Sequence, residues 1–386
     1  MPRAPKIPSA PAKLNPACLA RFRGKLLAWF RRAKRDLPWR GTHDPYRVWI
    51  SEIMLQQTRV GAVIPYYKRF MKRFPNVRAL ANARMETVLQ HWAGLGYYSR
   101  ARNLHRAAKE IVSRHGGRFT REMEAALTLP GIGSYTAAAV LSIAYDEPFA
   151  VLDGNVARVL TRLGAARADL RAPRRWRQFE RDSAALLDTR APGDWNQAMM
   201  ELGATVCIPI APRCKECPVA AFCRARALGI ENELPPKRRK RATEQITLAA
   251  AVLLDPRGRT LLMRPEPHDA AAEEQSLFSN LWQFPAVVSP GKSSKKNLAK
   301  LLTNRYKIKL AGLASRLSPL PSARHSVTFR VITLAPFLLR LERLPSPTGI
   351  NVKAISLNSV SRLAVSSATK KIAAAAIQRL AESRNA

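Results

Sequence analysis

Four cysteines packed into seventeen residues constrain this chain more than any other feature of its sequence. They lie in the stretch CIPIAPRCKECPVAAFC with the spacing Cys-x6-Cys-x2-Cys-x5-Cys and are Cys207, Cys214, Cys217 and Cys223. Thiolates this close together can ligate one small metal centre, and sulfur ligands select zinc or an iron–sulfur cluster. Zinc sites usually contain two Cys-x2-4-Cys pairs, whereas this spacing contains one. The pattern therefore favours a 4Fe–4S cluster over zinc.

Two disulfides are the alternative use of these cysteines. The chain has one further cysteine, Cys18, so the total of five is odd, and no apolar signal segment is apparent. Both features suit a reducing compartment rather than an oxidising one. We therefore expect metal ligation and a cytoplasmic protein, as in a bacterial cell.

The charge of the chain points to a polyanionic partner. Lys and Arg total 65 against 27 Asp and Glu, which gives a formal net charge of +38 over 386 residues. Such a charge attracts nucleic acid and makes its binding depend on salt, although basic composition alone is weak evidence. No apolar run approaches the ~20 residues that span a bilayer, so we expect a soluble protein without a membrane partner.

Changes in composition predict two folded domains. Residues 1–18 are expected to form a disordered basic tail, with a transit peptide as the alternative, and residues 19–230 show apolar spacing typical of helices. The segment 231–245, ENELPPKRRKRATEQ, is predicted as a basic linker, with a nuclear signal as the alternative reading of KRRKR. Residues 246–386 combine strand-like runs with two helical stretches, so we expect an α+β domain there.

A glycine turn in the helical half predicts a DNA-backbone contact. The sequence LPGIGSYTA (129–137) places Gly131 and Gly133 just before the helical run AAAVLSIAY. Glycines permit a tight turn with exposed backbone N–H groups, and a helix N-terminus adds to a phosphate site. We expect a helix–hairpin–helix rather than a simple helix–helix turn.

Two carboxylic acids are candidates for acid–base chemistry. Asp153, in VLDGNV, stands where a helix begins, so backbone donors should keep it ionised, although an ordinary N-cap is the alternative. Glu52, in WISEIML, has apolar neighbours, and desolvation should raise its pKa so that it holds a proton near neutrality. One neutral and one charged carboxyl group is the pairing that breaks a glycosidic bond.

The chain resembles the endonuclease III superfamily of DNA glycosylases, and within it the adenine glycosylases of the MutY type. The resemblance lies in the cysteine spacing and in the motifs LPGIG, VLDGN and SEIMLQQT. The resemblance covers about residues 20–386. It implies an all-α helix–hairpin–helix glycosylase domain with a 4Fe–4S loop, followed by an α+β Nudix-like domain. It also implies a monomer that acts on double-stranded DNA and removes adenine mispaired with 8-oxoguanine or guanine.

The resemblance assigns catalytic roles to four positions. Glu52 matches the acid that protonates adenine at N7, Asp153 the carboxylate that stabilises the sugar cation, and Asn155 a residue that assists it. Tyr135 stands where relatives with lyase activity carry a Schiff-base lysine, so the resemblance implies a monofunctional enzyme.

The resemblance also assigns DNA contacts. Trp39 and Arg40 match residues of the adenine pocket, Leu55, Gln56, Gln57 and Thr58 match the wedge that enters the duplex, and Tyr97 matches an aromatic residue that stacks beside the lesion. The loop that carries Arg213 is expected to meet phosphates together with Gly131 and Gly133.

The second domain resembles a Nudix fold at LWQFP (281–285), which raises the alternative of a nucleotide pyrophosphatase. That chemistry needs clustered carboxylates for magnesium, yet no Asp or Glu lies between Glu274 and Glu342. We therefore expect a lesion reader. The stretch HSVTF matches its recognition loop, with His325 and Thr328 as the contacts, and Phe329 replaces a second histidine of the family pattern.

Two other functions remain as alternatives. An endonuclease III-like pyrimidine glycosylase with AP-lyase activity is disfavoured by Tyr135 and by the extra C-terminal domain. A non-catalytic DNA-binding or redox-sensing protein would not need both Glu52 and Asp153.

Overall fold

The computed structural model describes residues 14–167, 170, 172–236, 242–264, 281–289, 293–327, 329–346 and 351–385. Its contacts divide the chain into two compact units, Met1–Ala83 with Ser99–Arg239 and Arg84–Tyr98 with Lys240–Ala386. The division falls inside the predicted linker 231–245. The segment Arg84–Tyr98, which the sequence analysis places in the first domain, groups with the second unit. No helix in the described ranges is long and apolar enough to cross a bilayer.

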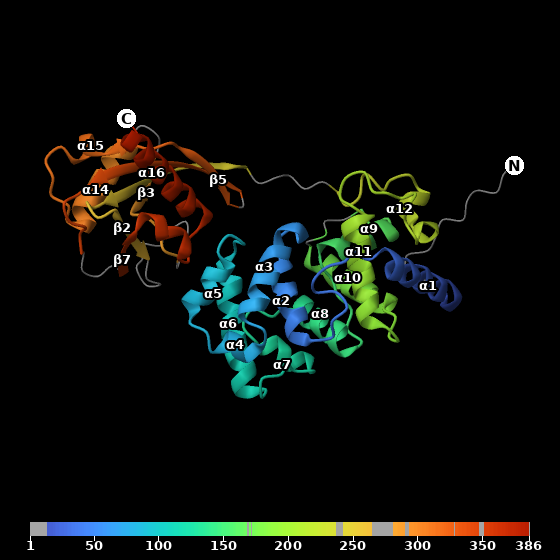
Figure 1. Ribbon diagram of the computed structural model, residues 1–386. Coiled ribbons are helices and arrows are strands. Elements are labelled where there is room, and N and C mark those ends of the chain that lie inside the picture. Colours follow the sequence, from blue (N-terminus) through green and yellow to red (C-terminus); the bar gives the residue numbers. More distant parts are fainter. Residues whose placement is uncertain are drawn as a thin grey trace. The chain divides into compact units, whose positions relative to one another are not determined.

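The expectation of a helical region before residue 230 is confirmed for the described residues (Figure 1). Its helices are α1 (Pro16–Ala33), α2 (Pro45–Leu55), α3 (Val60–Arg73), α4 (Val77–Ala81), α5 (Met85–Trp92), α6 (Tyr98–Arg114), α7 (Met123–Thr128), α8 (Ser134–Tyr145), α9 (Gly154–Leu163), α10 (Pro173–Leu186), α11 (Pro192–Thr205), η2 (Ala220–Phe222) and α12 (Arg224–Ala227). Of these, α5 belongs to the segment that groups with the second unit.

Helix α8 forms the centre of the first unit. Every residue from Thr136 to Ala144 is buried, and α2, α7 and α11 pack against this helix. Small alanines at positions 137–139 let neighbouring helices approach closely, and Asp146, in the left-handed region, ends the helix. This packing brings the C-terminal end of α2 and the N-terminal end of α8 to the same place.

The predicted tail 1–18 extends too far toward the C-terminus. Residues 1–13 lie outside the described residues, but α1 already begins at Pro16. The Asn15 side chain accepts a hydrogen bond of 2.8 Å from the Cys18 backbone N–H, and Pro16 occupies the first helical turn, where a missing N–H costs nothing.

The α+β expectation for the second unit is confirmed. Its described strands form one mixed sheet in the order β4-β6-β1-β2-β7, with β3 beside β1 and β5 beside β6. Among the described strand pairs, only the central pair β1–β6 is parallel. The elements are β1 (Glu244–Leu254), β2 (Arg259–Arg264), β3 (Ala286–Val288), α14 (Ser294–Tyr306), α15 (Leu313–Arg316), β4 (Ser318–Pro319), β5 (Ala323–Val327), β6 (Arg330–Arg340), β7 (Asn351–Ser356), η4 (Leu357–Arg362) and α16 (Ser367–Asn385).

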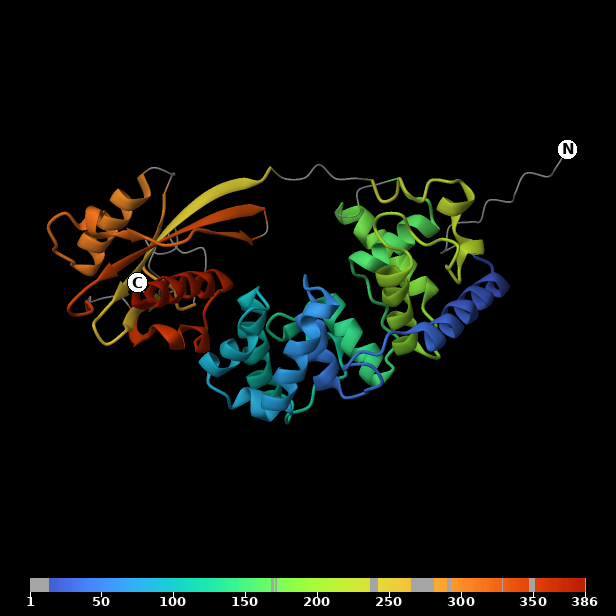
Figure 2. The same ribbon diagram turned by 45° about the horizontal axis from the view of Figure 1, so that its top comes forward.

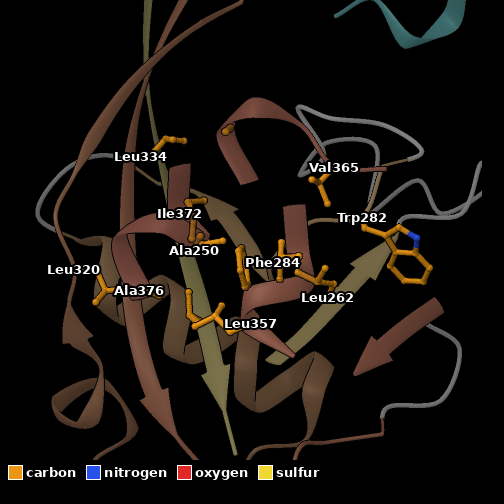
Figure 3. Packing of buried hydrophobic residues seen from close by; sticks show 14 of the residues in the cluster. Ala250, Leu262, Trp282, Phe284, Leu320, Leu334, Leu357, Val365, Ile372 and Ala376 are labelled. Atoms are coloured by element: carbon orange, nitrogen blue, oxygen red, sulfur yellow. The ribbon is translucent and has the colours of Figure 1, made fainter. Parts of the chain in front are cut away.

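The central strand β1 is buried on both faces because helices cover each of them (Figure 2). Ala250 and Val252 point to the cluster formed with η4 and α16, and Figure 3 shows Ala250 beside Ile372 and Phe284. Ala249 and Ala251 point to the opposite cluster, which α14 and α15 complete. Because both faces of β1 are buried, its sequence is a nearly continuous run of apolar residues.

The sheet of the second unit begins two residues before the predicted boundary at 246. Glu244 starts β1 and pairs with Arg330 of β6, whose Nε lies 2.8 Å from the Glu244 carboxylate. The β1–β6 ladder therefore extends into the segment predicted as linker. Residues 237–241 of that segment lie outside the described part.

Candidate active site

The predicted helix–hairpin–helix consists of α7, the turn at residues 129–133 and α8. Gly131 has φ +76°, and a Cβ atom there would lie 2.7 Å from Cβ of Asn103, so the position requires glycine. Gly133 is the N-cap of α8, and its own carbonyl accepts from Ala137. The turn therefore leaves the first N–H groups of α8 available to a ligand.

A cavity of about 480 Å³ brings half of the predicted site residues together, including all four catalytic candidates. It is lined from α2 and the segments before and after it, from the start of α3, and from α8, α9 and α11. The predicted residues among its lining are Trp39, Arg40, Glu52, Leu55, Gln56, Gln57, Thr58, Tyr135, Asp153 and Asn155. Its volume lies within the range typical of small-molecule binding sites.

Glu52 lies in the last turn of α2 and is only 6% exposed. Burial raises the pKa of its carboxyl group to about 7, and the nearby charge of Asp153 contributes in the same direction. The Tyr135 hydroxyl donates a 2.6 Å hydrogen bond to Oε2 and partly opposes this rise. Because Oε2 accepts from Tyr135, Oε1 is left to carry the proton. The sequence-based expectation of a raised pKa agrees with this arrangement.

Asp153 is the N-cap of α9, as expected from its position before a helix. Its Oδ1 accepts from the Val156 N–H at 2.7 Å, and its Oδ2 accepts from Nδ2 of Asn155 at 2.9 Å. These donors lower the pKa of Asp153, but its burial is the larger effect and leaves that pKa above its usual value. The sequence reasoning took the donors into account and missed the desolvation, because burial of this side chain depends on distant elements.

Glu201 of α11 is a residue of the cavity that the sequence analysis missed. It is 1% exposed and binds Arg35 at 2.6 Å through Nε and Arg40 at 2.7 Å through Nη2. Burial would raise the pKa of Glu201, but the two guanidinium groups together lower it below its usual value. The signal was present in the run DWNQAMMELGAT, where a lone Glu among apolar residues repeats the pattern around Glu52.

Besides Gly131 and Gly133, three described residues among the predicted contacts do not line this cavity. Tyr97 is an exposed residue with φ +49° in the turn before α6. Arg213 is exposed on the cysteine loop, where its Nη1 lies 3.9 Å from Oε2 of Glu216. His325 lies on β5 in the second unit, where burial and then Lys371 lower its pKa. Thr328 lies outside the described residues.

The four cysteines lie on the loop between α11 and α12, and each is partly buried and free of a disulfide. Burial raises the pKa of the Cys217 thiol to about 12, and the other three cysteines act on it in the same direction. Their sulfur atoms are therefore close enough to influence one another. Within the described ranges, no three His, Cys, Asp or Glu side chains form a site for one metal ion. In a 4Fe–4S cluster each cysteine binds a different iron, so its ligands do not have to converge on one ion.

Comparison with known proteins identifies the class to which this fold and cavity belong. A family model described as "HhH-GPD superfamily base excision DNA repair protein" matches residues 50–181, a range that contains Glu52, the hairpin and Asp153.

Curated relatives narrow the class. The mouse protein "Adenine DNA glycosylase" is 34% identical over 411 aligned positions, which cover 91% of this chain and 77% of the relative. The protein of that name from Buchnera aphidicola subsp. Acyrthosiphon pisum is 31% identical, covering 83% of this chain and 87% of the relative. The human one is 46% identical, but the match covers 53% of this chain and 39% of the human protein. The chain belongs to the adenine DNA glycosylase family.

Proposed function

We propose that this protein is a monofunctional DNA glycosylase that hydrolyses the N-glycosidic bond of adenine mispaired with 8-oxoguanine or guanine. It would act as a monomer on double-stranded DNA in a bacterial cytoplasm. The observation that carries the proposal is the carboxyl group of Glu52, which can hold a proton near neutrality in a cavity that Asp153 also lines.

The chemistry divides between the two carboxyl groups. Protonated Glu52 donates its proton to N7 of a flipped adenine, which makes the base a better leaving group. Ionised Asp153, oriented by Asn155 and the Val156 N–H, supports the positive charge that develops on the sugar. Water then adds to C1′ of the sugar cation, and the proton that it loses restores the Glu52 carboxyl group. Tyr135 offers no amine for an imine, and its hydroxyl orients Glu52 instead.

The loop after α2 provides a means of extruding the base. Gln57 is exposed and has φ +56°, whereas the amide of Gln56 donates a 3.2 Å hydrogen bond to Oγ1 of Thr136. We assign entry into the duplex to Gln57 with Leu55, because Gln56 is held toward α8. Extruding a base costs a few kcal/mol, which contacts of this kind must offset.

The second unit would read the lesion rather than hydrolyse a nucleotide. Support comes from the basic character of α14 and its surroundings, where carboxylates for magnesium are missing from the sequence between Glu274 and Glu342. His325 of β5 and the neighbouring Thr328 are the proposed contacts to the altered base, and Tyr97 is proposed to stack beside it.

We assign Cys207, Cys214, Cys217 and Cys223 to a 4Fe–4S cluster that would hold the loop carrying Arg213 in a shape suited to DNA phosphates. Analysis of anaerobically purified protein should find iron and acid-labile sulfide in equal amounts. Stoichiometric zinc without sulfide would assign the four thiolates to a single metal ion instead.

A single-turnover assay tests the proposed activity. Three duplexes carry adenine opposite 8-oxoguanine, adenine opposite guanine, or thymine glycol, and each is treated with and without alkali after reaction. We expect adenine release from the first two and strand cleavage only after alkali. Release of thymine glycol with direct strand cleavage would establish the pyrimidine glycosylase with lyase activity. Binding without release from any duplex would leave a non-catalytic DNA-binding protein.

A further inference from the structure

We propose that Arg100 is a positioning residue that holds the loop Leu55–Thr58, here called the wedge loop, in the conformation that enters DNA. Arg100 lies in the first turn of α6 and reaches the C-terminal end of α2. Its Nη1 donates to the carbonyls of Ile53 at 2.9 Å, of Met54 at 3.0 Å and of Gln56. Its Nη2 donates to Oγ1 of Thr58 at 3.1 Å.

The charge of Arg100 is suited to this position. The last carbonyls of a helix lack partners within the helix, and the helix dipole makes this end partly negative. A guanidinium group presents several donors in a fixed plane, so one side chain can bind carbonyls of α2 and a hydroxyl beyond it at the same time. Hydrogen bonds from a charged donor are also stronger than those between neutral groups.

Apart from the bond between the Gln56 amide and Thr136, the wedge loop depends on weak contacts of its own. Gln57 has φ +56°, a region that non-glycine residues rarely adopt, and the hydrogen bonds within the loop are long. Thr58 donates from its backbone to Leu55 at 3.2 Å and from its hydroxyl to Gln56 at 3.3 Å. The bonds from Arg100 therefore tie this loop to α6.

The same bonds connect the wedge loop to the acid. The Gln56 N–H donates to the carbonyl of Glu52 at 3.3 Å, so the end of the helix that Arg100 holds also carries the candidate acid. A loop ordered in advance does not lose conformational entropy when it enters the duplex. We therefore assign Arg100 to extrusion of the base rather than to cleavage of the bond. This inference rests on the proposed function, because it takes the wedge loop as the element that enters DNA.

Two duplexes separate extrusion from chemistry. In one, adenine is paired with 8-oxoguanine, and in the other it faces an abasic site, so that the target base has no partner to lose. We expect Arg100→Ala to slow single-turnover release about 100-fold on the first duplex, and by a few fold at most on the second. Fluorescence of 2-aminopurine at the target position should show less extrusion by the variant on the paired duplex.

Matched variants control for charge and for folding. Arg106→Ala removes an exposed positive charge from the same helix, and it should leave the ratio of the two rates unchanged. Arg100→Lys keeps the charge but cannot donate to α2 and Thr58 together, so we expect it to recover part of the rate. Thr58→Val should slow release on the paired duplex less than Arg100→Ala does, because it removes only the bond from Nη2 of Arg100.

The outcomes separate the inference from the proposed function. Wild-type protein that releases no adenine from either duplex would refute the proposed function, and the inference with it. A second result would refute the positioning role alone. In it the wild type is active, and Arg100→Ala slows release by equal factors on both duplexes or on neither. The proposed function would then stand.

Discussion

Glu52→Gln should bind the adenine·8-oxoguanine duplex with nearly wild-type affinity and leave the adenine attached. The amide keeps the size of the carboxyl group and an oxygen that can accept from Tyr135 at the 2.6 Å contact, so the cavity keeps its shape. It has no proton to give to a leaving base. General acid catalysis contributes about 10²–10⁴-fold to a rate, so we expect single-turnover release to fall by about a thousandfold. Gel-shift titration of the same preparation measures the affinity.

The pKa of about 7 for Glu52 adds a pH signature to this prediction. Wild-type release should fall about tenfold for each pH unit above that value, because only the protonated acid reacts. A rate that stays flat from pH 6 to about 9, or near-normal release by Glu52→Gln, would show that another group donates the proton.

The stability of the folded protein should also depend on the protonation of Glu52. The folded-state pKa of Glu52 is raised, so its contribution to stability is fully present below the unfolded-state pKa and is lost as pH rises through about 7. The loss amounts to about 3 kcal/mol at 1.36 kcal/mol per unit of pKa. Thermal melting of Glu52→Gln should therefore improve relative to the wild type between pH 5 and about 8. Tyr135→Phe keeps an ionisable Glu52 but removes the donor that opposes the rise of its pKa, so its loss of stability should extend to higher pH than that of the wild type.

Local patterns made half of the site predictable. Glu52, Asp153 and the glycine turn each lie in a short motif whose chemistry is visible from neighbouring residues, and the cavity brings Glu52 and Asp153 together. Apolar periodicity likewise distinguished the helical region from the sheet. These features depend on contacts within one or two turns of the chain, which a sequence displays directly.

Features that depend on distant contacts were not predictable. Glu201 becomes a site residue because α11 meets Arg35 and Arg40, more than 160 positions earlier in the chain. Arg100 reaches carbonyls more than 40 positions away, and nothing in GLGYYSR indicates that contact. The burial that raises the pKa of Asp153 has the same origin. Each of these results from packing between helices. The sequence shows Glu201 as a lone Glu among apolar residues but does not indicate which cations it meets.

Glu201→Ala should destabilise the helical unit by about 3–5 kcal/mol, since it removes the buried partner of two cations. The Arg40 side chain is 12% exposed and cannot turn fully to solvent, and burial already lowers its pKa while Glu201 raises it. Loss of the carboxylate leaves that charge desolvated against α11. Urea unfolding, followed by helical circular dichroism, measures the change.

Asp194→Ala is the matched control for this prediction, because Asp194 lies on the same helix and pairs with Arg31 at 3.3 Å on the surface. Exposed pairs of this kind are worth about 0–1 kcal/mol, so the two variants should differ several-fold in their effect. Glu201→Gln keeps the shape and hydrogen-bond acceptor of the side chain, and we expect it to lie between them. Equal losses of unfolding free energy for Glu201→Ala and Asp194→Ala would mean that water reaches the Arg35–Glu201–Arg40 cluster. Burial would then not strengthen the ion pairs that Glu201 makes. The positive charge of Arg40 would then be hydrated in the free enzyme, and an entering base would have to displace that water.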